Sequence, residues 1–62
     1  MSITQVLEKE LETKYRKKWD AVNVYSKYIG TTTQDGKLMA VFSVYQIDRM
    51  SRNIIKNETV LV

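Results

Sequence analysis

The chain has 62 residues, no cysteine, no histidine and a formal net charge of +3 at pH 7. A chain of this length forms one domain, here expected over residues 1–62, and buries only about 60% of the surface that its unfolded form exposes. Without cysteine and histidine it has no disulfide, no usual zinc ligands, no common general base and no thiol nucleophile. We therefore expect no metal, no cofactor and no enzyme activity.

The N-terminal segment has the pattern of an amphipathic helix. Ser2 and Gln5 have the spacing of a capping box, in which each side chain bonds the other residue's backbone amide. Apolar residues recur at helical intervals: Ile3, Val6, Leu7, Leu11 and Tyr15. We predict a helix over residues 3–18, with Glu8, Glu10 and Glu12 on a solvated face.

A β-hairpin is predicted next. Asp35-Gly36 is typical of a type I′ turn, because both central residues of that turn need a positive φ. The segment 22–30 also fits a continued helix, but the turn requires a strand before it, and β-branched and aromatic residues favour one. We predict strands over about 22–34 and 37–47.

Both faces of this hairpin are apolar. Regular pairing out of a two-residue turn puts Tyr28 on the same face as Met39, Val41 and Tyr45. One helix covers only one face, so the C-terminal segment or another protein chain must cover the other. We predict that these four residues bind a partner, unless Met50, Ile54, Ile55 and Leu61 of the same chain cover them.

The C-terminal segment has two interpretations. Asp48 could cap a short helix that ends at Asn57 and leads into a strand over 59–62. Alternatively, residues 54–62 form a third strand that contains a turn. We favour the short helical connection and terminal strand. The predicted fold class is α+β, with the N-terminal helix packed on the antiparallel hairpin and a C-terminal short helix and strand.

Residues 14–19, KYRKKW, place four cations in five positions before the only tryptophan. On a helix with about 100° per residue, Lys14, Lys17 and Lys18 cluster at one margin, and Arg16 points nearly opposite. With Lys27 and Arg49, these three lysines are candidate nucleic-acid contacts, since basic residues interleaved with aromatics suit phosphates and bases. Much of this charge also complements the negative C-terminal end of the helix dipole.

Two binding functions follow from these patterns. We favour a small non-enzymatic protein-interaction module, acting as a homodimer or as a regulatory inhibitor or adaptor that binds a larger protein. The alternative is a small basic nucleic-acid-binding protein, acting as a dimer. No small-molecule substrate is expected, because a chain this small would struggle to enclose a substrate pocket. No membrane contact is expected either, since no apolar run approaches 18 residues. The N-terminus lacks the pattern of an export signal, so we expect a cytoplasmic location.

Overall fold

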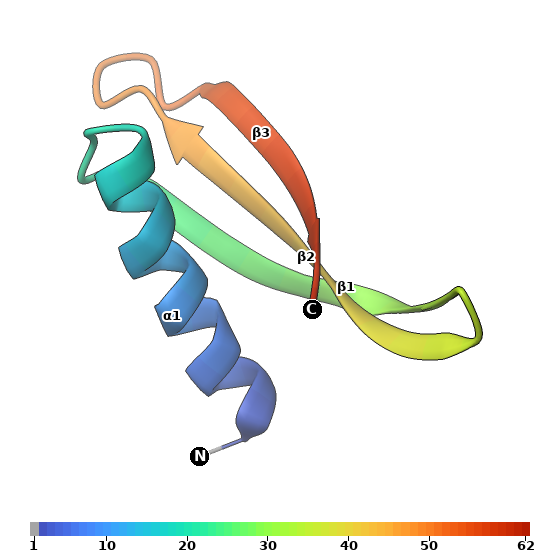
Figure 1. The fold of residues 1–62 in the computed structure, drawn as a ribbon. Helices are drawn as coiled ribbons and strands as arrows, with labels where there is room; N and C mark the ends of the chain where they lie inside the picture. The colour runs from blue at the N-terminus through green and yellow to red at the C-terminus, as the bar shows by residue number, and fades with distance from the viewer. Residues whose placement is uncertain (1) are drawn as a thin grey trace.

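The computed structural model describes residues 2–62 as one helix packed on a three-stranded antiparallel sheet (Figure 1). Helix α1 spans Ile3–Lys18, and the strands are β1 (Val24–Gln34), β2 (Lys37–Ile47) and β3 (Ile54–Leu61). The strand order is β1-β2-β3, so β2 is central and both other strands are edges. The α+β prediction is confirmed, as are the helix and the hairpin, although the first strand begins at Val24.

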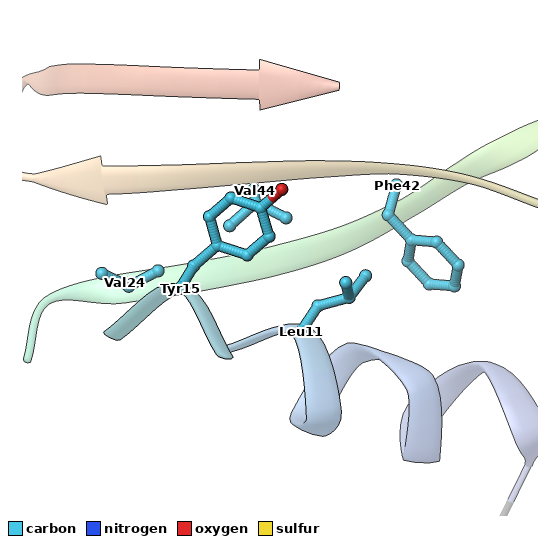
Figure 2. Packing of buried hydrophobic residues seen from close by; sticks show 5 residues of the cluster. All are labelled: Leu11, Tyr15, Val24, Phe42 and Val44. Atoms are coloured by element: carbon cyan, nitrogen blue, oxygen red, sulfur yellow. The ribbon is translucent and has the colours of Figure 1, made fainter. Parts of the chain in front are cut away.

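The capping box positions the start of α1. The Ser2 hydroxyl accepts a hydrogen bond from the Gln5 amide, and the Gln5 side chain accepts one from the Ser2 amide, each at 3.4 Å. From there the apolar stripe of α1 turns Leu11 and Tyr15 onto the sheet (Figure 2). The described residues bury five hydrophobic side chains in this layer: Leu11, Tyr15, Val24, Phe42 and Val44.

A β-bulge in β1 changes which side chains share a face. Pairing is regular from Gln34–Lys37 to Gly30–Val41, and then shifts between Tyr28 and Gly30. Gly30 has φ +152°, a value that residues with a Cβ rarely adopt. The extra residue reverses the alternation of side chains along the rest of the strand.

The bulge overturns one prediction. Tyr28 is paired with Phe42, and the two ring centroids are 5.5 Å apart on the side of the sheet that α1 covers. Tyr28 therefore does not share a face with Met39, Val41 and Tyr45. The prediction assumed an unbroken ladder, and the one extra residue of the bulge moves the Tyr28 side chain to the opposite face of the sheet.

The predicted short helix after β2 is also wrong. The chain makes one turn, in which the Arg52 amide donates to the Asp48 carbonyl at 2.8 Å. Arg52 then adopts φ +61° and ends the turn, so that Ile54 pairs with Ile47 as β3 begins. Asp48 still acts as a cap, because its carboxylate accepts from the Ser51 hydroxyl at 2.9 Å and from two backbone amides. These hydrogen bonds hold the pKa of the Asp48 carboxyl below its usual range.

Side chains of α1 bond the outer edge of β1. The Glu8 carboxylate accepts from the Tyr28 amide at 2.8 Å, and the Glu12 carboxylate accepts from the Ser26 amide at 3.2 Å. Arg16 continues the row by donating to the Val24 carbonyl at 3.1 Å, and it also pairs with Glu12. Glu8 and Glu12 therefore do not belong to a solvated helix face as predicted.

Replacing Gly30 by alanine tests the bulge. Nothing lies within 4 Å of the added Cβ, so the cost comes from the backbone conformation alone. We expect Gly30→Ala to lower the free energy of unfolding by about 1–2 kcal/mol in chemical denaturation. Thr32→Ala, at an exposed position of the same strand, is the control. Equal stabilities of the two variants would contradict this assignment.

Glu8→Ala tests the closed edge of β1. The substitution leaves the Tyr28 amide without its acceptor, so we expect a loss of about 1–2 kcal/mol and faster amide hydrogen exchange at Tyr28. Glu10→Ala removes an exposed carboxylate from the same helix and should have little effect. Equal losses of unfolding free energy in the two variants would contradict a stabilising role for the hydrogen bond between Glu8 and the Tyr28 amide.

Candidate functional site

The face of the sheet opposite α1 is the candidate site. We call it the open face and define it by its apolar side chains: Tyr25, Met39, Val41, Tyr45, Ile47 and Leu61. The cross-strand register aligns Tyr25 with Tyr45 and Val41 with Leu61. No helix or loop within residues 2–62 covers this face, because the one helix lies on the other side (Figure 1).

The open face divides into two apolar patches. The aromatic patch holds Tyr25, Tyr45 and Ile47, with the two tyrosine ring centroids 6.1 Å apart. The aliphatic patch holds Met39, Val41 and Leu61.

A polar band separates these patches, because the register places Lys27, Ser43 and Thr59 side by side across the three strands. Within it the Ser43 hydroxyl donates to the Asn57 side chain at 3.3 Å. The open face thus presents two apolar patches with a polar band between them.

The C-terminal segment does not cover the open face. Residues 54–61 join the sheet as an edge strand instead of folding across it. Met50 is 93% exposed and Ile55 is 58% exposed. The alternative in which the chain covers its own second face is therefore excluded for these residues.

The molecule exposes more surface than a compact protein of its size. Its accessible area is 4682 Å², against about 4,200 Å² for a compact 7.3 kDa protein. Its radius of gyration is 12.4 Å, against roughly 10.6 Å for 62 residues. The end of the β1–β2 hairpin accounts for much of this shape, since it projects beyond α1 and β3 (Figure 1).

Three of the four predicted partner-binding residues lie together. Met39, Val41 and Tyr45 are partly exposed on the open face, whereas Tyr28 lies on the α1 side. The bulge also places Tyr25 on the open face, where an unbroken ladder would turn it to the α1 side. Gly30 was the available signal, since a glycine inside a strand pattern often marks a bulge.

The five cations predicted to contact nucleic acid lie on different surfaces. Lys14 and Lys18 flank the Tyr15 ring, and Lys18 also pairs with Glu58 at 3.8 Å. Lys27 lies on the open face. The other two are Lys17, exposed on α1, and Arg49, which donates to the Asn23 side chain from the β2–β3 loop.

Sequence reasoning missed one cation, Lys56. Its ammonium lies 5.4 Å from the centre of the Trp19 ring. Trp19 in turn meets Tyr15 edge to face, with the ring centroids 5.0 Å apart. The prediction gave no role to Lys56, because its approach to Trp19 depends on where β3 lies.

Tyr15 is the titratable group that the fold perturbs most clearly in the core. Burial raises the pKa of its phenol above 10.0, and the neighbouring Glu58 carboxylate raises it further. The ring is only 4% exposed, although Lys14 and Lys18 lie close to it. This pattern fits a structural tyrosine in the core.

The described residues hold no group of three or more metal-ligating side chains among histidine, cysteine, aspartate and glutamate. Within the same range, no helix has the length and apolar character needed to cross a membrane. Comparison with known proteins finds no matching family model, curated protein or solved structure.

Tyr15 predicts a pH dependence of stability. Its folded pKa exceeds its unfolded value, so the stability it contributes is complete below about pH 10 and is lost as the pH rises through the folded pKa. We expect Tyr15→Phe to show a shallower fall of unfolding free energy above pH 10 than the unmodified chain. Identical alkaline profiles for Tyr15→Phe and the unmodified chain would contradict the assignment.

Proposed function

We propose that this chain is a small protein-interaction module that binds another protein through its open face, either as a dimer or as a regulatory partner of a larger protein. The observation that carries the proposal is an apolar sheet face that no helix or loop within residues 2–62 covers, while these described residues bury five hydrophobic side chains. Because small domains are marginally stable, burial of this face against a partner would add the buried apolar surface that the small core lacks.

The composition of the open face suits an interface. Tyrosine and methionine are enriched at protein interfaces, and the face presents Tyr25, Tyr45 and Met39 on a rigid sheet. The polar band beside Ser43 would fix the register of a partner, since an unmatched polar group costs free energy when it is buried. A partner with apolar groups on both sides of a polar centre would complement this surface.

The proposal includes no catalytic step. Several carboxylates already have structural roles: Glu8 and Glu12 bond the edge of β1, and Asp48 caps the β2–β3 turn. With no histidine or cysteine in the sequence, few groups remain for acid–base or nucleophilic chemistry.

A nucleic-acid surface has less support. A phosphate backbone requires cations along one continuous path, whereas Lys27 lies on the open face and Lys14 and Lys18 flank the Tyr15 ring on the α1 side. Lys18 is also partly neutralised by Glu58. We therefore keep protein binding as the proposed function.

Tyr45→Lys tests the open face, because it places a charge in the aromatic patch. We expect about tenfold weaker association with a partner. Self-association is measured by sedimentation over a dilution series, and binding of other proteins by comparing what each variant captures. Gln34→Lys adds the same charge at the hairpin turn and should behave like the unmodified chain.

The proposal fails if Tyr45→Lys changes neither the self-association of the chain nor the set of proteins that it captures. Thermal unfolding of each variant must show that the fold is retained, because Tyr45 lies on the central strand.

A further inference from the structure

The two edges of the sheet differ in one respect that bears on binding. On β1, the outward amides of Ser26 and Tyr28 and the outward carbonyl of Val24 all bond side chains of α1. Residues 24–28 of this edge are therefore closed to another strand. Within residues 2–62, no side chain protects the edge of β3 in this way.

The backbone groups on the outer edge of β3 follow from its pairing. Ala40 and Val62 exchange both of their backbone hydrogen bonds at 2.9 Å. Hydrogen-bonded pairs alternate with non-bonded pairs along an antiparallel ladder, so Asn57, Thr59 and Leu61 direct their amides and carbonyls away from β2. Within residues 2–62, no side chain or loop forms a hydrogen bond with these outward groups.

The space beside β3 is also free. No Cα of α1 lies within 8 Å of a Cα of β3, because α1 packs over β1 and β2. Most side chains of β3 are exposed, and Ile54 and Ile55 are each more than half exposed. A further strand can therefore lie along β3 without meeting the helix.

We propose that β3 pairs with β3 of a second copy of this chain, antiparallel and about a two-fold axis at Asn57, to form one six-stranded sheet. This goes beyond the proposed function, because the contact uses backbone groups of an edge and leaves both open faces free. The two open faces then become continuous, and a larger partner could bind across them.

Charge complementarity selects this register. Lys56 and Glu58 lie on the same face of β3, on either side of Asn57. An axis at Asn57 puts Lys56 of each copy opposite Glu58 of the other, giving two favourable cross-strand pairs. An axis at Glu58 would put two like charges opposite each other, and an axis at Thr59 would put Glu58 opposite Val60.

The helices do not prevent this arrangement. Strands are about 4.8 Å apart in a sheet, so two copies of α1 over β1 and β2 would lie roughly 20 Å apart across the axis. Packed helices are only about 8–10 Å apart, so the two helices would not collide.

Single-cysteine variants test the register, because the chain has no cysteine of its own. Paired Asn57 residues would have Cα atoms about 5.5 Å apart, which is within the range of a disulfide. The two Thr59 residues would be roughly 14 Å apart. We expect oxidised Asn57→Cys to migrate as a covalent dimer and Thr59→Cys to stay monomeric. Equal cross-linking of both variants, or none in either, would overturn the proposal.

Charge reversal tests the same contact in the reversible dimer. Lys56→Glu and Glu58→Lys each put like charges opposite each other, and we expect roughly tenfold weaker self-association in sedimentation. The double variant restores both pairs and should recover the original association. Lys18→Gln removes the partner of Glu58 within the same chain, and it shows how much the loss of that ion pair alone weakens self-association. A double variant as weak as the single variants would overturn the register.

These experiments distinguish binding through the β3 edge from binding through the open face. Tyr45→Lys alters only the open face, so it should leave the cross-linking of Asn57→Cys unchanged. Cross-linking that survives in a chain whose open face binds nothing would support the edge contact and reject the proposed function. Open-face binding without any cross-linking would support the proposed function and reject the edge contact.

Discussion

The row of contacts from α1 to the edge of β1 is the constraint on which the rest of the structure depends. Four residues of a helix rise about 6 Å, and two residues of a strand rise about 6.6 Å. Glu8, Glu12 and Arg16 therefore meet successive outward-facing residues of β1. This match holds the helix over β1 and β2, so that only a few side chains near its C-terminal end reach β3, as in the pairing of Lys18 with Glu58.

The bulge at Gly30 makes that row of contacts available. In an unbroken ladder, Tyr28 would be paired with Ser43, and its amide would point toward β2. With the extra residue, the Tyr28 side chain turns to Phe42 and its amide turns outward to Glu8. One glycine thus determines both the composition of the core and the docking of the helix.

The same asymmetry produces the two unprotected surfaces. The helix covers one face and closes residues 24–28 of one edge, so the other face and the edge of β3 remain accessible. Both surfaces involve β3, which has only β2 as a neighbour and whose side chains are mostly exposed. Because the described residues bury just these five hydrophobic side chains, there is a physical reason for the chain to bury more of its surface by association.

The sequence alone determined the elements that local chemistry specifies. The capping box and the apolar periodicity define α1, and Asp35-Gly36 defines the hairpin turn. It also placed Met39, Val41 and Tyr45 on one face, because these residues alternate on a single strand. Only the tertiary structure decided the bulge, the role of Glu8 and the position of β3. Each of these depends on groups far apart in the sequence, whose meeting no local pattern encodes.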